Sequence, residues 1–434
     1  MTDTPASPPP AAAETSWSPL KRVLFRFAFG YIGLYIFPFP LDQLPYLEVL
    51  VRPWHGLWSV VVPWVGQTAL GVEATQHPTG SGDTAFAYVR LFCIVVVALV
   101  TAGVWTMLDR HRPHYRRLHE WLRAYVRMWL FATLVFYGAI KVIKSQFTGP
   151  TLDRLLQPIG DASPMGLLWT FMAASVSYNV FTGMGEMVGG LLLTTRRTTL
   201  LGALVSFGVM AHVTALNLSY DVPVKQLSAH LMLFAAFLAL PDAVRLARFF
   251  VFNRSTEARP LPALFTRPGW NRAALVLRTL FVVGLVLHSL YSSHDMRRTY
   301  GDASPRSPFR GVWNVEEFET DGQARPPLVA DETRWRRVIF DYSQWFAVQR
   351  MNDHRLQLAV KHDEEKKTLE VYRRQDPSWG TTMLTYEQPE PGVLILSGPF
   401  EKQQVKARLV LQEEKEFLLT SRGFHWVSEY PFNR

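Results

Sequence analysis

Long apolar runs separated by short polar segments fill the first two thirds of the chain. A bilayer core about 30 Å thick requires ~20 apolar residues in helical conformation. Runs of about that length predict seven membrane-spanning helices: 22–39, 86–108, 122–145, 166–194, 198–218, 224–246 and 273–292. The run 166–194 would measure roughly 44 Å as one helix. Because that exceeds the bilayer core, we expect it to tilt or to break near Gly183.

A further run, 50–72, is apolar but is interrupted by two prolines, a histidine and three tryptophans. Loops rich in Lys and Arg stay in the cytoplasm, and here these are 109–123, the turn after 194, and 245–272. Placing them inside leaves 50–72 on the outer face, within the segment 40–85. The N-terminus is then cytoplasmic and the C-terminal domain periplasmic. We therefore predict a multi-pass protein of a bacterial-type inner (cytoplasmic) membrane.

After Tyr291 the pattern changes to short alternating runs of apolar and polar residues, separated by Gly, Pro, Asp or Asn. Alternation with a period of two is typical of β-strands with one buried face. About eight to ten such runs lie between 300 and 434, which predicts an antiparallel β-barrel or sandwich. The expected fold class is an α-helical polytopic membrane protein of about seven spans with a C-terminal β domain.

These patterns divide the chain into five segments. They are 1–17, a Pro- and Ala-rich tail expected to be disordered; 18–121, N-terminal membrane helices with the outer-face segment; 122–246, a four-helix core; 247–299, a basic cytoplasmic linker with the last membrane helix; and 300–434, the soluble β domain. The tail lacks the apolar core of a cleaved signal peptide.

The 434 residues carry a formal net charge of +9, mostly from arginines clustered between the apolar runs. Such clusters are typical of membrane topology signals, so no nucleic-acid partner is expected. Cys93 is the one cysteine, and it lies in an apolar run. An intramolecular disulfide and a CxxC metal or redox motif are therefore excluded, and no metal site is predicted.

Four of the ionisable residues inside predicted spans are candidate functional residues, because such groups are costly to bury and are commonly functional. They are Lys141, Glu186, His212 and His230. The helices that carry the two histidines are joined by a short turn and must be antiparallel neighbours. Both imidazoles therefore lie at similar depth, roughly 9 Å from the outer end. A structural role stays open for each: snorkelling for Lys141, an ion pair for Glu186, and a hydrogen-bonded core position for each histidine.

Polar residues at the outer helix ends and in the outer loops add candidate ligand contacts. They are Asp83, Gln146, Asp161, Asn217, Tyr220, Asp221 and Lys225. Asp161 or Ser163 is also expected to cap the helix that follows. With the four membrane residues, this set predicts a polar pocket that opens outward beneath the loops and the β domain.

Two motifs lie on helices of the stretch 122–246. They are Arg127 with Gly138-Ala-Ile-Lys141, and Glu186-Met-Val-Gly189-Gly190-Leu-Leu-Leu193 before Arg196. With these motifs the stretch resembles the DoxX-like membrane proteins, a family built on a four-helix unit. The resemblance implies membrane redox or thiol maturation, since the family includes a small subunit of a thiosulfate:quinone oxidoreductase. The G-x-x-K helix with an outer β domain is also similar to the vitamin-K-dependent carboxylase-like family, which implies that Lys141 acts as a base on a quinol-type cofactor.

The β domain has a weaker likeness of its own. Gly311 and Trp313 in its first strand, with Arg422 near its end, resemble the lipocalin signature. The alternative is a tryptophan that closes one end of any small β-barrel.

The leading hypothesis is a membrane protein that binds a quinone or a similar lipid-soluble ligand in the outward-facing pocket. Lys141 and Glu186 would form a charged pair, while His212 and His230 would shuttle protons. One alternative is a membrane-anchored lipid-binding or assembly protein that acts through its periplasmic β domain. Another is a proton-coupled small-solute transporter with Glu186 as the proton site. No motif in the sequence indicates a particular reaction. The lipid bilayer is the expected partner, and no protein partner is indicated.

Overall fold

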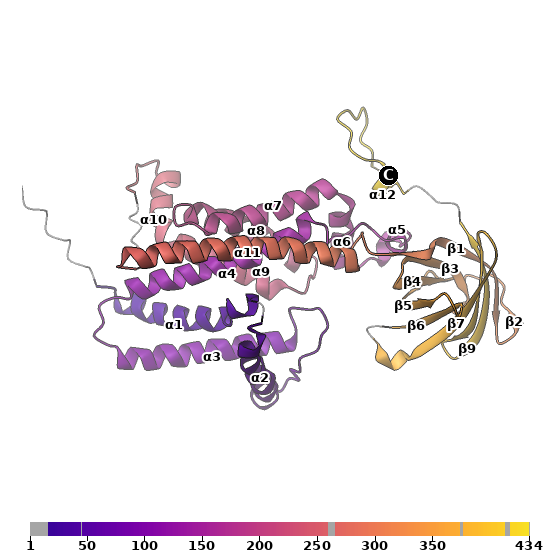
Figure 1. Cartoon of the computed structure of the whole chain (residues 1–434), viewed down its shortest axis with the longest axis horizontal. Coiled ribbons are helices and arrows are strands. Elements are labelled where there is room, and N and C mark those ends of the chain that lie inside the picture. The colour runs from indigo at the N-terminus through magenta and orange to yellow at the C-terminus, as the bar shows by residue number, and fades with distance from the viewer. Residues whose placement is uncertain (1–15, 45, 259–264, 374–375, 413–416, 434) are drawn as a thin grey trace, which may run out of the picture. The chain divides into compact units, whose positions relative to one another are not determined.

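The computed structural model describes residues 16–44, 46–258, 265–373, 376–412 and 417–433. The chain divides into two compact units, which Figure 1 draws as helices and a barrel of strands. The first unit holds Met1–Ala139 and Gly183–Ser289 and is helical, whereas the second combines Ile140–Thr182 with Leu290–Arg434. The segment 140–182 thus packs with the β domain. Of the predicted tail 1–17, residues 1–15 lie outside the described residues, so that prediction is not tested.

The α-helices of the described residues follow one another in chain order. They are α1 Pro19–Ile36, α2 Glu48–Val65, α3 Ala85–Leu108, α4 Arg116–Val142, α5 Leu152–Leu155, α6 Pro164–Ala174, α7 Val176–Leu193, α8 Thr199–Ser219, α9 Lys225–Ala239, α10 Ala243–Leu246, α11 Pro268–Tyr300 and α12 Leu418–Ser421. Short 3₁₀ or π turns lie at Leu41–Gln43, Gly66–Leu70, Ile159–Asp161, Leu240–Asp242, Ala247–Val251 and Pro377–Trp379.

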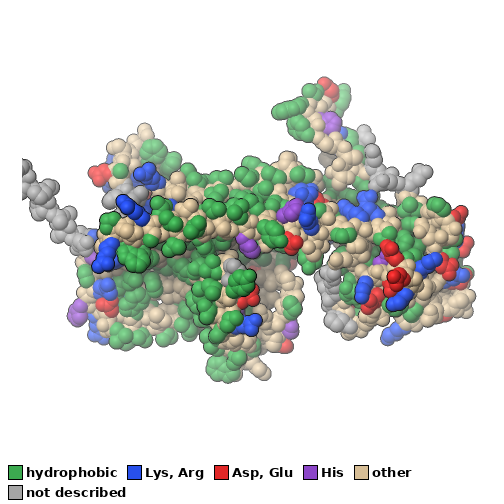
Figure 2. All heavy atoms as spheres, in the orientation of Figure 1, with side chains coloured by type: hydrophobic (Ala, Val, Ile, Leu, Met, Phe, Trp, Pro, Cys, Tyr) green, Lys and Arg blue, Asp and Glu red, His purple; other side chains and the backbone are tan. Residues whose placement is uncertain are grey.

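Six helical segments in the described part of the chain are long and apolar enough to cross a membrane. They are Pro19–Gln43, Ala85–Leu108, Arg116–Val142, Thr199–Ser219, Lys225–Val251 and Pro268–Tyr300. They confirm six of the seven predicted spans and the class of multi-pass membrane protein. Figure 2 shows the hydrophobic side chains that cover the visible face of these helices. The run 50–72, which forms α2 and the turn after it, is not among the six.

The seventh predicted span, 166–194, is two helices, and the predicted break near Gly183 is wrong. The break lies at Ser175, whose backbone is extended at φ −116° and ψ 107°. The Ser175 hydroxyl oxygen accepts a hydrogen bond from the Tyr178 backbone N–H at 3.3 Å. A serine in this role satisfies the first turn of α7 and starts a new helix. Gly183 lies inside α7, where it allows a neighbouring helix to approach.

Glycines bring α7 into close contact with both of its neighbours in the helical unit. A Cβ atom at Gly138 of α4 would lie 2.6 Å from the carbonyl oxygen of Gly183. A Cβ atom at Gly189 would lie 2.8 Å from the hydroxyl oxygen of Ser206 on α8. Gly185, one turn before Gly189 on α7, faces Val209 of α8. Small residues at this spacing let membrane helices pack backbone to backbone.

A buried arginine joins α1 to the loop that follows α3. Arg26 is 2% exposed, and its guanidinium donates to the Tyr115 hydroxyl at 2.8 and 3.0 Å and to the Asp109 carbonyl at 2.7 Å. The Tyr115 hydroxyl in turn donates to an Asp109 carboxylate oxygen at 2.8 Å. This hydrogen bond lowers the pKa of Asp109 below its usual value. Arg26 therefore holds the start of α1 against the end of α3 and the loop that follows it.

The strands of the described residues all lie in the second unit. They are β1 Arg306–Thr320, β2 Gln323–Ala324, β3 Trp335–Tyr342, β4 Trp345–Arg350, β5 Arg355–Asp363, β6 Thr368–Tyr372, β7 Thr381–Glu390, β8 Val393–Phe400 and β9 Gln403–Leu411. Consecutive strands from β3 to β9 pair antiparallel, and β1 pairs with both β3 and β9. The sheet therefore closes on itself, with β2 as a short extension of β1. This confirms an eight-stranded barrel and excludes the sandwich.

The barrel interior is filled by its own side chains. Each of the eight strands contributes to one continuous apolar cluster. Val338, Val348, Leu358, Leu394 and Leu409 in that cluster are all 0% exposed. An eight-stranded barrel is just wide enough to be filled by side chains or to hold one small ligand. Here apolar side chains from all eight strands form this core, and lipid binding by the β domain stays a prediction.

The predicted role of Arg422 beside Trp313 is wrong, and a different arginine, Arg334, is buried against the backbone of β1 and β3. Trp313 is buried and donates from its indole N–H to the Phe309 carbonyl at 2.8 Å. Arg334 is 2% exposed, and its guanidinium donates to backbone carbonyls of Arg325, Trp335, Val315 and Glu316 at 2.9–3.3 Å. Arg422 follows the last strand, is exposed, and lies over the ring of Phe432. The barrel closes at Leu411, before the chain reaches Arg422.

Candidate functional site

A tyrosine and a histidine form a short hydrogen bond within the apolar helical unit. The Tyr31 hydroxyl on α1 lies 2.5 Å from Nε2 of His230 on α9. His230 is 5% exposed, and its Nδ1 lies 2.6 Å from the Gln226 carbonyl oxygen. A carbonyl oxygen can only accept, so Nδ1 carries a proton. In the neutral ring Nε2 is then the acceptor, and Tyr31 donates to it.

Aromatic rings surround this pair. Tyr35 stacks on His230 with ring centroids 4.0 Å apart and an interplanar angle of 9°. Phe27, Tyr31 and Tyr35 recur every four residues on α1 and stack in turn at 5.8 and 6.3 Å. Phe234 packs edge-on against Tyr35 at 5.5 Å. Tyr31 and Tyr35 are only partly buried, so this surface (Phe27, Tyr31, Tyr35 and His230) presents the accessible parts of its stacked rings beside a polar group.

The loop before α3 fixes the start of the helix that carries His230. Asp83 accepts hydrogen bonds from the backbone N–H groups of Lys225 at 2.7 Å and Gln226 at 3.0 Å. A carboxylate in this position satisfies the free amide groups at a helix N-terminus. The Gly82 N–H also donates to the Pro223 carbonyl at 2.8 Å. Asp83 thus positions Gln226, whose carbonyl oxygen holds the Nδ1 proton of His230.

Two comparisons with known proteins return no match: no family model matches the chain, and no solved structure does. The uncharacterized protein YwoB from Bacillus subtilis (strain 168) is 30% identical over 136 residues. Those residues cover 86% of YwoB and 31% of this chain. The chain belongs to the YwoB family. The name of YwoB assigns it no activity, and the DoxX-like resemblance stays a prediction.

The predicted histidine pair does not form in this YwoB-family chain. His212 is exposed on α8, whereas Thr214 and Asn217 of that helix are buried. The His230 ring contacts Tyr31, Tyr35 and Phe234 instead. The two histidines share a depth along their helices but face different surroundings.

The other outer residues form local structure around the α8–α9 turn. Asn217 donates from its amide to the Ser228 hydroxyl at 3.0 Å, which joins the two helices. Asp221 pairs with Lys225 at 2.8 Å, but the Asp221 side chain is 84% exposed. An ion pair so exposed contributes little to stability. Tyr220 ends α8, and its N–H donates to the Leu216 carbonyl.

Lys141 and Glu186 are both buried, at 7% and 2% exposure. The structure divides them between the second and first units. Gln146 has a buried Oε1 with no hydrogen-bond partner among the described residues. Asp161 is exposed, and Ser163 is the residue that caps α6, through the Gly166 N–H at 3.1 Å.

The remaining motif residues hold helices together in the YwoB-family fold. Arg127 of α4 donates to the carbonyl oxygens of Leu193 at 3.0 Å and Thr194 at 3.4 Å, where α7 ends. Arginine at a helix C-terminus satisfies free carbonyls and interacts well with the helix dipole. Gly138 and Gly189 allow the close approaches described above. Sequence analysis missed Tyr31 and Tyr35, although aromatic residues at a spacing of four on the first span were a usable signal.

Proposed function

We propose that this membrane protein binds a quinone or a similar lipid-soluble ring ligand at Tyr31 and His230. The observation that carries the proposal is the 2.5 Å contact between the Tyr31 hydroxyl and His230 Nε2, set among stacked rings in an apolar helical unit. A lipid-soluble ring needs flat apolar faces and one or two polar atoms that fix its orientation. Tyr31, Tyr35 and His230 together supply both.

The protonation state of His230 sets which form of such a ligand fits. With a neutral imidazole, Tyr31 donates to Nε2, and its oxygen accepts from the hydroxyl group of a quinol. With an imidazolium, Nε2 donates to Tyr31, whose hydroxyl proton then points to the carbonyl oxygen of a quinone. Loss or gain of one proton at His230 therefore reverses the hydrogen bond offered to the ligand.

We extend this proposal to membrane redox chemistry through two residues of the DoxX-like motifs. Lys141 and Glu186 are proposed as the charged pair of the site, as the DoxX-like and carboxylase-like resemblances imply. Both are buried, and ionisable groups buried among membrane helices are commonly functional. His212 has no part in the proposal, because it is exposed.

Replacing Tyr31 by phenylalanine is expected to weaken ligand binding about three- to tenfold, the worth of one hydrogen bond. His230→Phe should do the same while keeping the ring that stacks on Tyr35. The measurement is quenching of intrinsic fluorescence by decylubiquinone and by menadione, with the full chain in lipid nanodiscs.

Tyr88→Phe is the matched control, because Tyr88 is exposed on α3 and 48% accessible. It should leave the affinity unchanged. Thermal stability measured on the same samples separates lost binding from lost folding. Equal affinities of the wild type and both site variants for both quinones would contradict the proposal.

The C-terminal domain is proposed to lie in the periplasm, which requires an odd number of crossings. Six candidate spans would return the chain to the cytoplasm, so α7 must be the seventh. Its length, Val176–Leu193, corresponds to roughly 27 Å, close to the thickness of the bilayer core. A reporter that is active only outside the cytoplasm, fused after Arg434, is expected to be active. Activity of a cytoplasm-specific reporter at that position would overturn this topology.

A further inference from the structure

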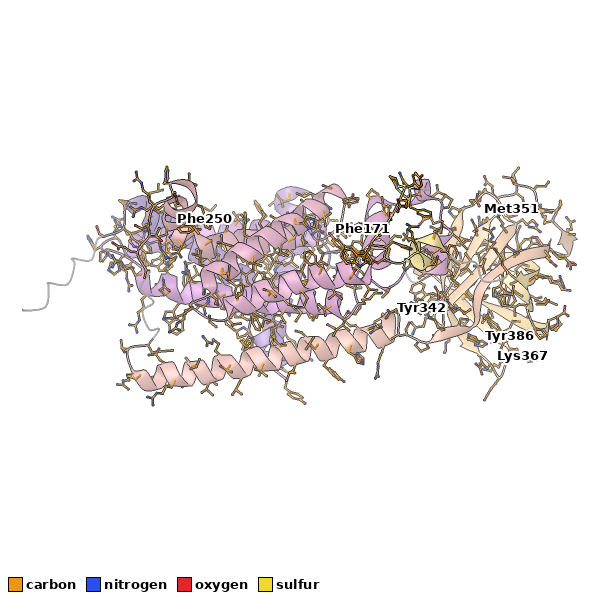
Figure 3. All side chains as sticks on the ribbon, turned by 90° about the horizontal axis from the view of Figure 1, so that it is seen from above. Phe171, Phe250, Tyr342, Met351, Lys367 and Tyr386 are labelled. Atoms are coloured by element: carbon orange, nitrogen blue, oxygen red, sulfur yellow. The ribbon has the colours of Figure 1, made fainter. Side chains whose placement is uncertain are left out.

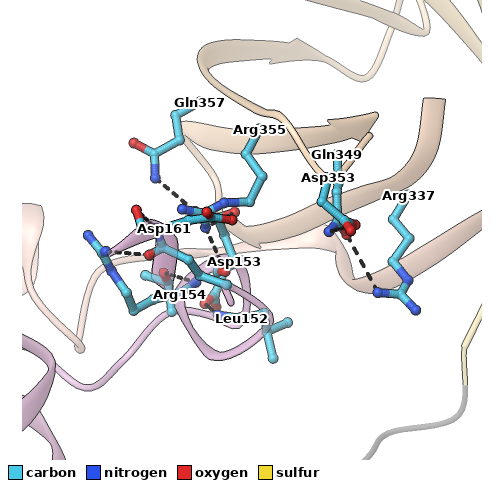
Figure 4. Close-up of polar contacts among 12 residues, drawn as sticks. Leu152, Asp153, Arg154, Asp161, Arg337, Gln349, Asp353, Arg355 and Gln357 are labelled. Atoms are coloured by element: carbon cyan, nitrogen blue, oxygen red, sulfur yellow. Dashed lines mark hydrogen bonds and ion pairs between the residues drawn. The ribbon is translucent and has the colours of Figure 1, made fainter. Parts of the chain in front are cut away.

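A short helix from the segment 140–182 docks on the barrel. Asp153 of α5 accepts from the Arg355 guanidinium at 2.8 Å and from the Gln357 amide at 2.7 Å, as Figure 4 shows. The backbone N–H of Leu152 donates to Asp341 of β3 at 3.0 Å. The Asp153 side chain is 10% exposed and that of Asp341 is 11% exposed. These contacts hold α5 against β3 and β5.

A cavity of about 410 Å³ lies beside this junction. It is lined by residues near α5, by the end of α11, and by the hairpin that joins β3 to β4. Asp153 and Asp341 contribute carboxylates to its wall, and Tyr300, Tyr342 and Trp345 contribute rings. Tyr300 is 69% exposed and Trp345 is 40% exposed, so part of each ring is accessible to a ligand. Figure 3 shows Tyr342, where burial raises the pKa of the phenol above its usual value, so that it remains a neutral donor.

The charges around the cavity discriminate between classes of ligand. Two carboxylates in the wall disfavour an anion, because they accept hydrogen bonds but cannot donate any to it. Each carboxylate is already paired with arginine: Asp153 with Arg355, and Asp341 with Arg306 and, at 3.6 Å, with Arg310. These guanidinium groups offset the acids, so the cavity has little attraction for a cation. A neutral polar ligand is favoured on both counts.

The hydrogen bonds already made leave room for donors from a ligand. A carboxylate offers about four acceptor positions. Each Asp153 oxygen accepts one side-chain hydrogen bond, and Oδ2 of Asp341 accepts one backbone N–H. Ligand hydroxyl groups can therefore donate to the remaining acceptor positions. The volume of about 410 Å³ falls within the usual range of small-ligand sites.

We propose that this cavity binds a neutral, hydroxyl-rich ligand of the sugar class, whose ring stacks on Trp345 and Tyr300 while its hydroxyls donate to Asp153 and Asp341. The site shares no residue with the Tyr31–His230 pair. The two proposals can therefore fail independently.

The test is isothermal titration calorimetry of the full chain in nanodiscs with one ring in three charge states: glucose, glucuronate and glucosamine. Maltose is added as a longer neutral probe. We expect heat from glucose or maltose, and affinities at least tenfold weaker for the two charged sugars. Trp345→Ala should weaken neutral-sugar binding at least tenfold, and Tyr300→Ala, at a more exposed position, should also weaken it.

Trp426→Ala is the matched control, because Trp426 is 91% exposed and does not line the cavity. It should leave binding unchanged. No binding of either neutral sugar at about 10 mM would overturn the proposal, since that corresponds to less than ~3 kcal/mol of affinity. Tighter binding of a charged sugar would overturn it too, as would full affinity in both ring variants.

Discussion

Replacing Arg334 by methionine is expected to lower the free energy of unfolding of the barrel by about 3–5 kcal/mol. The guanidinium is 2% exposed and donates to four backbone carbonyl oxygens. Methionine fills a similar volume but cannot donate, so these buried acceptors lose a partner.

Hydrogen exchange of the full chain in detergent measures this effect where it arises. Amides of β3 to β5 should exchange roughly 100- to 4,000-fold faster in Arg334→Met, while amides of the helical unit should not change. Arg337→Met is the control three residues further along the chain, in β3. Arg337 is only partly buried, and its contacts with Asn314 and Gln349 are 3.3 and 3.5 Å long. The Arg337→Met substitution should lower the free energy of unfolding by less than about 1 kcal/mol. Equal exchange in both variants would mean that Arg334 does not support the barrel.

Replacing Gly138 by alanine is expected to destabilise the helical unit by about 3 kcal/mol, the upper part of the range for overpacked sites. The new Cβ would lie 2.6 Å from the Gly183 carbonyl oxygen and 3.0 Å from the Met187 backbone nitrogen. Both are backbone atoms of α7, so the whole helix must move away from α4. A flexible side chain could not relieve the contact.

Thermal unfolding in detergent should show a fall in Tm of about 5–10 °C for Gly138→Ala. Gly103→Ala is the matched control on α3, where a Cβ would meet nothing within 4 Å. Alanine stabilises a helix interior relative to glycine by roughly 0.5–1 kcal/mol, so the control should be slightly more stable than the wild type. A similar Tm for both variants would show that α4 and α7 do not pack closely at Gly138.

Periodicity in the sequence was sufficient to predict the fold class. The strand regions follow from alternation, as in β9, where the buried Val405, Ala407 and Leu409 alternate with more exposed positions. A closed barrel is one of few ways to cover such a sheet. The break at Ser175 was missed because glycine was given more weight than serine. A serine hydroxyl can replace a helical hydrogen bond, whereas glycine inside a packed helix is stable when a neighbour lies against it.

The candidate site was predicted less well, because distance along a helix gives depth but not direction. His212 and His230 were placed at one depth, yet His212 lies two residues before the buried Thr214, which is about 200° around the helix. Its side chain therefore faces the opposite side. Tyr31 was missed because its contact with His230 joins α1 to α9, and no local pattern brings those helices together.

A density map of the full chain in nanodiscs with bound menaquinone or ubiquinone tests the central proposal most directly. The proposal predicts a quinone ring stacked beside Tyr35, with one of its carbonyl oxygens about 2.6–3.2 Å from the Tyr31 hydroxyl oxygen. The same preparation of Tyr31→Phe with His230→Phe should lack this density. A ring found elsewhere, or density at Tyr31 that survives both substitutions, would contradict the account.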